Sequence, residues 1–337
     1  QSVLGPHVGD LETLAARQRY LDHIRAMCQL YDAQPELLVC DQHPDYFSTR
    51  WASEQSIPTV TVQHHHAHVA AAMLEQDWLD REVLGVAWDG TGYATDGTVW
   101  GGEFLIATAT EYRRLACLRP FVLPGGEAAV REPWRVAVSL VYQSAGPEAA
   151  ARLCFDGVAS HEVSNLVRLL PKPGIWPSTT SAGRLFDGIA ALVLGLADAS
   201  FEGQPAMLLE AACDRDTAGE YALPLISGEP VTLDWRPLVE SVLEDRRAGL
   251  PVGMIAMRFH RALAGGIVAI AEHARLPVAL CGGCFYNQVL TELVVERIRR
   301  GCTLATPGVI PVGDGGLAAG QLAIAAARIA AGWQPCV

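Results

Sequence analysis

The sequence predicts an α/β fold of two lobes that close on a shared cleft. Near the start of the chain, short apolar or β-branched stretches alternate with a segment of helical periodicity, the pattern of α/β proteins. A length of 337 residues, with 50% of positions hydrophobic, suggests two lobes rather than one. No linker rich in Pro, Gly or Ser separates the halves, so we expect the lobes to face a common cleft.

Composition narrows the class of protein. The net charge of −12 disfavours a nucleic-acid surface, because phosphate binding needs clustered basic side chains. No apolar run reaches about 18 residues, so we expect no membrane-spanning helix. Residues 1–10 lack the basic and apolar regions of a signal peptide, so we expect none there. The cysteines, at positions 28, 40, 117, 154, 213, 281, 284, 302 and 336, are odd in number and scattered, which favours a reducing cytoplasm.

The first elements follow from residue spacing and from helix-ending residues. Asp10 can cap a helix whose apolar positions are three, four or seven residues apart, and Pro35 ends that segment. Short strands are expected at 37–40 and 58–62. The second of these strands leads into a helix that begins with a cluster of histidines.

A continuous apolar strand at 83–88 then delivers Asp89 into a Gly-rich turn, whose backbone amides can approach an anion. The turn consists of Gly90, Thr91 and Gly92. A second strand at 99–107 completes a hairpin that we expect to cover a ligand phosphate. Residues 121–135 predict an irregular crossover, and residues 134–155 a helix.

The second half is predicted to contain further helices joined by Gly-rich turns. Residues 181–196 form a helix capped by serine and closed by glycine, with Arg184 and Asp187 as the polar residues of its first turns. A long helix at 251–274 precedes a strand at 278–281. That strand runs into the turn G-G-C-F-Y-N at 282–287, and a loop at 311–316 opens an Ala-rich C-terminal helix.

Two histidines four residues apart are candidates for a metal site. On a helix, His64 and His68 lie on one face, next to the further histidines at positions 65 and 66. With Asp89 and Asp314 they form a mixed nitrogen and oxygen set, which suits iron, manganese or zinc with open positions. A zinc protease is disfavoured because the general-base Glu is missing. The alternative for an isolated pair is two histidines whose hydrogen bonds are satisfied at a lobe surface.

The Gly-rich turns together favour a nucleotide cleft. Glycines at 282 and 283 allow a nucleotide to approach the backbone. Taken alone, Asp187 could be an ordinary exposed helix residue and Asn287 a capping residue. Cys281 and Cys284 form C-G-G-C, for which incidental cysteines in a glycine turn are favoured over redox or zinc chemistry.

Seven motifs in order then resemble one family, the C-terminal carbamoyltransferase part of the HypF hydrogenase maturation proteins. They are H-H-H-A-H at 64–68, A-W-D-G-T-G at 87–92, W-G-G-E-F at 100–104, R-E-P-W-R at 131–135, S-A-G-R-L-F-D at 181–187, G-G-C-F-Y-N at 282–287 and D-G-G-L-A-A-G-Q at 314–321. More distantly, the chain is similar to TsaD and TobZ. The resemblance implies an actin-like ATPase architecture, with two ribonuclease-H-like lobes around a nucleotide and metal cleft.

The resemblance also implies roles for individual residues. It makes His64, His68, Asp89 and Asp314 the ligands of a divalent metal, iron or zinc, with magnesium or manganese as alternatives. Asp89 also belongs to the catalytic set, with Arg131 and Arg135 as candidates near phosphate or carbamoyl. The nucleotide, ATP or carbamoyl adenylate, is expected at Gly90, Thr91, Gly92, Gly183, Asp187, Gly282, Gly283 and Asn287. The expected division is a helical segment at 1–36, a first lobe at 37–155 and a second lobe at 156–337.

The implied activity is transfer of a carbamoyl group from carbamoyl adenylate to the C-terminal cysteine of HypE, for cyanide ligand synthesis in [NiFe]-hydrogenase. The YrdC-like domain that makes carbamoyl adenylate in the family has no counterpart in these residues, so we expect that donor to come from such a domain in cis or trans. A TsaD-like tRNA transferase is a rival, disfavoured by the acidic charge and by H-H-H-A-H in place of H-x-E-G-H. A nucleotide-binding scaffold without catalysis is a second rival.

Overall fold

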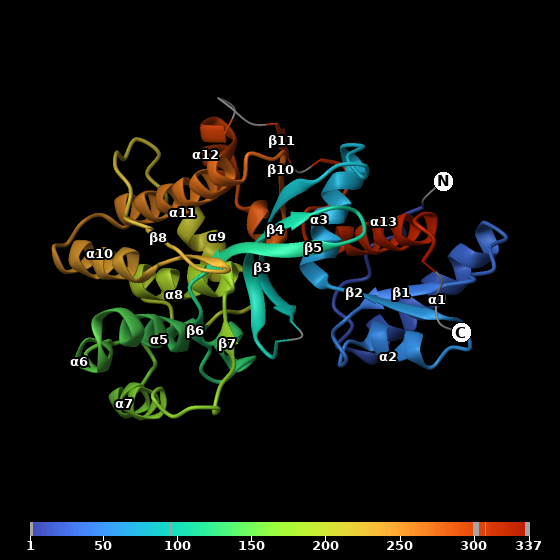
Figure 1. Cartoon of the computed structure of the whole chain (residues 1–337). Helices are drawn as coiled ribbons and strands as arrows, with labels where there is room; N and C mark the ends of the chain where they lie inside the picture. Colours follow the sequence, from blue (N-terminus) through green and yellow to red (C-terminus); the bar gives the residue numbers. More distant parts are fainter. Residues whose placement is uncertain (1–2, 95, 299–302, 307, 334–337) are drawn as a thin grey trace.

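A computed structural model describes residues 3–94, 96–298, 303–306 and 308–333. Strands and helices alternate along the chain (Figure 1). The strands are β1 (Leu38–Asp41), β2 (Thr59–Val62), β3 (Val83–Tyr93), β4 (Val99–Ala107), β5 (Tyr112–Leu118), β6 (Phe121–Val122), β7 (Ser178–Thr179), β8 (Leu225–Ile226), β9 (Val231–Leu233), β10 (Val278–Cys281) and β11 (Leu304–Ala305).

The helices are α1 (Leu14–Leu30), α2 (Phe47–Ser53), α3 (His64–Glu75), α4 (Ala128–Arg131), α5 (Pro133–Ala145), α6 (Pro147–Ala151), α7 (Ser160–Leu169), α8 (Ala182–Leu194), α9 (Gln204–Ala211), α10 (Arg236–Arg247), α11 (Val252–Ala274), α12 (Gln288–Ile298) and α13 (Leu317–Ala330). Two short 3-10 turns, η1 (Gly283–Tyr286) and η2 (Asp314–Gly316), precede α12 and α13. This alternation confirms the predicted α/β class.

Two sheets organise the molecule. The larger has nine strands, with the main order β11-β10-β3-β4-β5-β9-β8 and with β6 and β7 at its side. The strand β3 is an internal strand of this sheet, parallel to β10 and antiparallel to β4. The smaller sheet pairs β1 with β2 in parallel. In Figure 1 the blue elements α1, α2, β1 and β2 lie on one side, with α13 beside them, and the helices α5 to α12 gather on the other.

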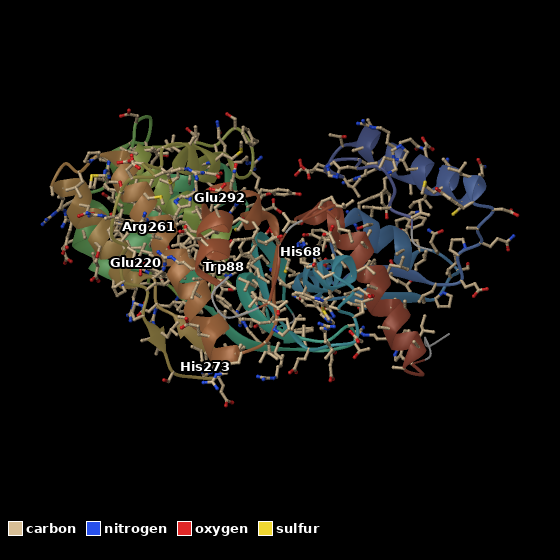
Figure 2. The ribbon with its side chains drawn as sticks, turned by 90° about the horizontal axis from the view of Figure 1, so that it is seen from above. His68, Trp88, Glu220, Arg261, His273 and Glu292 are labelled. Carbon is tan, nitrogen blue, oxygen red and sulfur yellow. The ribbon has the colours of Figure 1, made fainter. Side chains whose placement is uncertain are left out.

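The helix α3 is held on two sides. Apolar side chains of α3, among them Val69 and Met73, join the core beneath β3 and β10. Its other face packs on α13 so closely that a Cβ at Gly320 would overlap the carbonyl of Ala67. Figure 2 shows His68 on the α3 side and Arg261 on the α11 side, with Trp88 of β3 between them. The histidine helix is therefore a fixed platform inside the fold.

The predicted boundaries hold for most elements, with two local corrections. The cap of α1 is Thr13, whose Oγ1 accepts from the backbone N–H of Ala16 at 3.2 Å, and not Asp10. The predicted single helix at 134–155 is interrupted at Gly146, where φ is 89°, and this separates α5 from α6. A left-handed glycine followed by proline cannot continue a helix, so the break was readable from the sequence.

The Gly-rich segment after Asp89 differs more. The predicted turn at 90–92 is wrong, because β3 continues through Tyr93 with a register shift between Trp88 and Gly92. Such a bulge re-aims side chains beside a site while the strand remains paired. The hairpin itself is confirmed, since β3 and β4 pair antiparallel on either side of it.

The nine-stranded sheet contains strands from both sides of residue 155, the predicted boundary between the lobes. The nine-stranded sheet takes β3 to β6 from one side of that position and β7 to β11 from the other. The predicted lobe boundary there consequently does not follow the sheets. The elements that stand apart from the large sheet are β1 and β2 with their helices, and α13 joins them from the far end of the chain.

Within the described ranges, one helix, α11, is long and apolar enough to cross a membrane by length and composition alone. Its 18-residue window has a mean hydropathy of 1.3, and 67% of that window is buried inside the protein. Buried residues of α11 such as Phe259 and Leu263 belong to the main core. We therefore interpret α11 as a core helix.

Candidate metal centre

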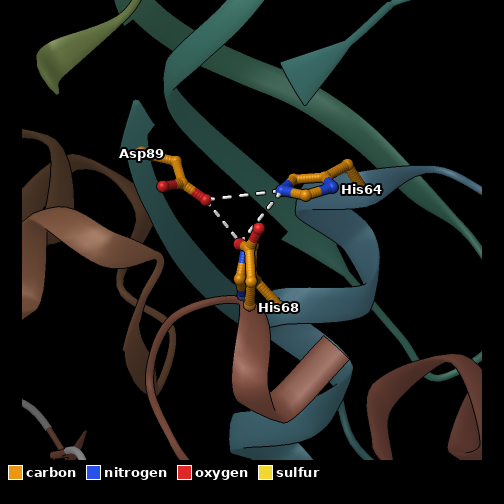
Figure 3. A group of neighbouring side chains, drawn as sticks. His64, His68 and Asp89 are labelled. Carbon is orange, nitrogen blue, oxygen red and sulfur yellow. Dashed lines mark ion pairs between the residues drawn. The ribbon is translucent and has the colours of Figure 1, made fainter. Parts of the chain in front are cut away.

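Four polar residues from three parts of the chain converge beside the N-terminal half of α3. The ligand atoms of His64, His68, Asp89 and Asp314 all lie within 4.8 Å of one another. Figure 3 shows the two imidazoles and the Asp89 carboxylate turned toward one another. The spacing of four residues puts both imidazoles on one face of α3, while β3 supplies Asp89 and η2 supplies Asp314.

The convergent atoms have the properties of a ligand set for a cation. The Nε2 atom of His68 lies 2.8 Å and that of His64 3.4 Å from Oδ2 of Asp89. Among the residues that the structure describes, none of these three atoms has a partner in hydrogen-bond geometry, although each is buried. Buried polar atoms are almost always satisfied, so three unsatisfied donors of electron pairs at one point fit a cation between them.

The fourth residue closes the set from the opposite side. Oδ1 of Asp314 lies 3.7 Å from Nε2 of His64 and 3.5 Å from Nε2 of His68. Its side chain is 68% exposed, whereas both imidazoles are 1% exposed. Two nitrogens and two oxygens suit iron, zinc or manganese, and the exposed side leaves room for further ligands.

The backbone orients Asp89. Its Oδ1 accepts hydrogen bonds from the N–H groups of Gly90 at 2.8 Å and Gly283 at 3.2 Å. This leaves Oδ2 to face the imidazoles. Gly90 and Gly283 thus orient the carboxylate that faces both imidazoles, a role that the sequence did not indicate.

Asp41, which sequence reasoning missed, orients His64. Its Oδ2 lies 2.8 Å from Nδ1 of His64, and its Oδ1 accepts from the backbone N–H of His43 at 2.8 Å. A carboxylate that accepts from Nδ1 fixes the tautomer whose Nε2 lone pair faces the centre. The signal was available: β1 ends at Asp41, and its parallel neighbour β2 ends at Val62, two residues before His64.

The centre carries excess negative charge. Burial alone would lower the pKa of His64, but the carboxylates of Asp41 and Asp89 outweigh it and raise the pKa to about 10. Burial likewise opposes ionisation of Asp89, and the neighbouring His64 and His68 nevertheless hold its pKa well below the usual range. Carboxylates that stabilise positive charge on imidazoles will also stabilise a metal cation.

The other two histidines of the cluster point elsewhere. Nε2 of His66 donates to the carbonyl of Thr108 at 2.9 Å, and burial lowers its pKa to about 4. Nδ1 of His65 pairs with the Gln63 side chain at 3.1 Å, and burial again lowers its pKa. The ring of His65 packs against Gly92, where a Cβ would overlap it. His65 and His66 are therefore buried histidines that each use one ring nitrogen in contacts away from the four clustered side chains.

The start of α8 packs directly on the strand that carries Asp89. Oγ of Ser181 caps α8 by accepting from the N–H of Arg184 at 3.0 Å, and it donates to the carbonyl of Asp89 at 3.1 Å. A Cβ on Gly183 would lie 2.8 Å from Cα of Gly90, so only glycine allows this approach. Gly183 is therefore near the metal centre through packing.

Asp187 is not an exposed helix residue. It is 1% exposed, and its Oδ2 lies 3.0 Å from Nε of Arg184. Neither carboxylate oxygen has a partner in hydrogen-bond geometry among the described residues. Burial raises the pKa of Asp187 to about 7 despite Arg184. A ligand can contact it only after surrounding side chains move.

Asn287 is engaged at both ends of its amide. Its Oδ1 accepts from the N–H of Leu290 at 2.8 Å at the start of α12, which is the capping role considered from the sequence. Its Nδ2 lies 2.9 Å from Nε2 of His260, whose Nδ1 is 2.8 Å from the carbonyl of Ala256. His260 can accept from Asn287 while donating to Ala256, so it fixes the amide orientation.

Three predicted residues lie outside these contacts. Among the described residues, neither Arg131 nor Arg135 forms an ion pair or hydrogen bond with the four clustered side chains; Arg135 instead pairs with Glu132 at 2.5 Å. Thr91 lies in the bulged part of β3.

The seven cysteines within the described ranges are free, and burial raises the pKa of Cys281 and Cys284 well above the usual range. Cys302 and Cys336 lie outside the described residues.

The fold and the cluster together define an α/β protein with two imidazoles and two carboxylates grouped beside the internal strand β3. The family described as "Carbamoyltransferase, Kae1-like Domain, second subdomain" matches residues 85–321, and "HypF Kae1-like domain" matches residues 1–75. The chain belongs to the HypF carbamoyltransferase family.

Relatives agree in sequence and in fold. Carbamoyltransferase HypF of Synechocystis is 37% identical, over 96% of this chain and 44% of its own length. A Carbamoyltransferase HypF homolog of Cupriavidus necator is 36% identical, over 91% of this chain and 82% of its own length. The crystal structure of full-length HypF in the phosphate- and nucleotide-bound form is 30% identical and superposes with a TM-score of 0.88, over 97% of this chain and 44% of that one. The chain thus spans less than half the length of most of these relatives.

Proposed function

We propose that this chain transfers a carbamoyl group from carbamoyl adenylate to the C-terminal cysteine thiol of HypE, on the path to a cyanide ligand of [NiFe]-hydrogenase. The observation that carries the proposal is the cluster of two imidazoles and two carboxylates, three of whose atoms are buried without a hydrogen-bond partner in the described part of the chain. Membership of the carbamoyltransferase family supports the reaction class. The reaction uses a mixed anhydride, so positioning and charge stabilisation are the main requirements.

The proposed step balances without a redox partner. The HypE thiol loses its proton to solvent, and its sulfur forms a bond to the carbamoyl carbon. The bond from that carbon to the phosphate oxygen breaks, and AMP leaves with the electron pair. A thiol ionises near neutral pH, so no strong base is required of this chain.

The residues of the chain have distinct roles in this proposal. His64, His68, Asp89 and Asp314 would hold a divalent metal, iron or zinc, with magnesium or manganese as alternatives. Bound there, the metal supplies a Lewis acid for the oxygens of the donor. Gly90 and Gly283 hold Asp89 in place through their N–H groups.

The nucleotide is proposed to lie beside the metal centre and the start of α8. Gly183 and Gly282 bring backbone segments close together here. The other residues proposed to contribute to the nucleotide site are Gly90, Thr91, Gly92, Asp187, Gly283 and Asn287. The two oxygens of Asp187, neither of which has a hydrogen-bond partner among the described residues, match the two vicinal hydroxyls of a ribose. Arg131 and Arg135 stay candidates for contacts with the phosphate or carbamoyl, since one is exposed and the other half-buried.

The partners are proposed from the family. A YrdC-like domain, in cis or in trans, would make carbamoyl adenylate, and HypE would present its C-terminal tail. We also propose a cytoplasmic location, in line with the scattered free thiols of the described residues.

The test is a transfer assay followed by mass spectrometry of HypE. The 337-residue chain, metal, ATP and carbamoyl phosphate should leave HypE unmodified, while addition of a YrdC-like domain should add one carbamoyl group to the terminal cysteine. A HypE variant without that cysteine is the control. Failure of the complete mixture would overturn the proposal, and binding of nucleotide without transfer would favour a scaffold. Modification of tRNA would instead favour the TsaD-like rival, against which the net charge of −12 stands.

Replacing Asp187 should weaken nucleotide binding and alter its pH dependence. Loss of two shielded, charge-assisted hydrogen bonds to a ribose in Asp187→Ala should cost about 1.5 to 3 kcal/mol. Because burial raises the pKa of Asp187 to about 7, its accepting, ionised form increases as pH rises through that value. Affinity for a non-hydrolysable ATP analogue should therefore rise with pH, as measured by calorimetric titration.

Asp187→Asn is the matched control, because it keeps the shape and should remove the pH dependence. Asn287→Ala should also lower the affinity for the ATP analogue, while the affinity for the metal should stay unchanged. Unchanged affinity in both Asp187→Ala and Asn287→Ala would place the nucleotide elsewhere, and loss of metal in either would show that the two halves of the site had been confused.

A further inference from the structure

The exposed Asp314 is the least constrained member of the metal centre. Its side chain is 68% exposed and comes from the short turn η2, whereas His64 and His68 are buried on a helix. Packing of its own side chain therefore contributes little to its position. What places Asp314 is the backbone of the loop that precedes it.

That loop is held at three points. The N–H groups of Val309 and Ile310 both donate to Oε1 of Glu75, the second at 3.2 Å. Farther along, the carbonyl of Val312 accepts from the N–H of Gly282 at 2.8 Å. The N–H of Gly313, next to Asp314, donates to the hydroxyl of Tyr286 at 3.4 Å.

The first of these anchors belongs to the helix that carries both imidazoles. Glu75 is the last residue of α3, seven residues after His68 and eleven after His64, so the three share one face of the helix. A side chain at Gly308 would overlap the Glu75 carboxylate, which shows how closely the loop approaches. One rigid element therefore supplies two metal-facing nitrogens and the anchor of the loop that supplies a metal-facing oxygen.

The position of Glu75 is unfavourable by local preference. A carboxylate at a helix C-terminus faces the negative end of the helix dipole. Two backbone donors to one ionised oxygen offset this, because charge-assisted hydrogen bonds are the stronger kind. A residue that opposes its local preference while holding a loop beside a site indicates a functional constraint.

We propose that Glu75 is a positioning residue of the metal centre, which acts by holding the 308–313 loop so that Asp314 reaches the metal. The inference rests on the proposed metal role of Asp314. Loss of the anchor leaves the other three residues in place and weakens the fourth contact. The metal is then bound more weakly, without unfolding of the chain.

The test measures Zn²⁺ affinity of the metal-free 337-residue chain by competition with a chromogenic chelator. Glu75→Ala should weaken binding about 10-fold or more, the scale of residues that support metal ligands. Glu75→Gln keeps an oxygen that can accept from the loop and should lose much less. Glu272→Ala, an exposed glutamate in the last turn of α11, is the matched control and should bind as the unsubstituted chain does.

The decisive comparison uses the Asp314→Ala background. If Glu75 acts through Asp314, Glu75→Ala should add no further loss there, because coupled residues are not additive. Equal losses in both backgrounds, or normal affinity in Glu75→Ala alone, would overturn the inference while leaving the metal centre intact. Absence of Zn²⁺ binding by the unsubstituted chain would overturn the centre itself and the inference with it.

Discussion

His68→Ala should abolish metal binding at the centre and, with it, carbamoyl transfer. Nε2 of His68 lies 2.8 Å from Oδ2 of Asp89 and 3.5 Å from Oδ1 of Asp314, so it is the member nearest to both carboxylates. Loss of a direct ligand should exceed the roughly 10- to 100-fold effect of supporting residues, so we expect at least about 100-fold weaker binding. Metal content by elemental analysis and the transfer assay measure the two effects.

The matched control for this prediction is His66→Gln. His66 lies on the same helix and is equally buried, but it donates to the carbonyl of Thr108 and not to the centre. Gln can donate similarly, so metal affinity should stay while stability falls by about 1 kcal/mol. Full metal occupancy in His68→Ala, or loss of metal in His66→Gln, would contradict the assignment of the two histidines.

Much of the fold was predictable because local rules and packing agree. The strand β10 has its predicted bounds, and α8 begins after its serine cap and ends at Gly195 in the left-handed conformation. Both are buried elements with clear end signals. The cap of α1 was misplaced because Asp10 and Thr13 are both good capping residues, and the tertiary contacts that select one are absent from a sequence pattern.

The four residues of the cluster could be predicted from the sequence, whereas most of the residues that orient them could not. Helical spacing brought His64 and His68 together, but it could not tell them from His65 and His66, which face carbonyl and amide partners on neighbouring elements. The role of Asp41 beside His64 depends on the pairing of β1 with β2, which the sequence pattern does not specify. Contacts between segments far apart in the chain leave no periodic signal, and the support of a site consists mostly of these.

Gly282→Ala should be among the most destabilising single substitutions in the chain. Gly282 has φ 94° and ψ 159°, a region that only glycine adopts readily, at a cost of about 1 to 3 kcal/mol for other residues. A Cβ there would also lie 2.8 Å from the carbonyl carbon of Trp88, and backbone of a central strand cannot move aside. We expect a loss of about 3 kcal/mol or more in the free energy of unfolding, measured by urea denaturation of the metal-free chain.

Gly249→Ala separates the two causes. Gly249 has φ 73°, also left-handed, but nothing lies within 4 Å of a Cβ built on it, so only the backbone term of about 1 to 2 kcal/mol applies. The excess loss in Gly282→Ala then measures the close approach of β10 to β3 beside Asp89. That approach also places the N–H of Gly283 on Oδ1 of Asp89, so Gly282→Ala should weaken Zn²⁺ binding and Gly249→Ala should not. Equal destabilisation by the two variants, with equal metal affinity, would show that the contact with Trp88 neither strains the fold nor supports the centre.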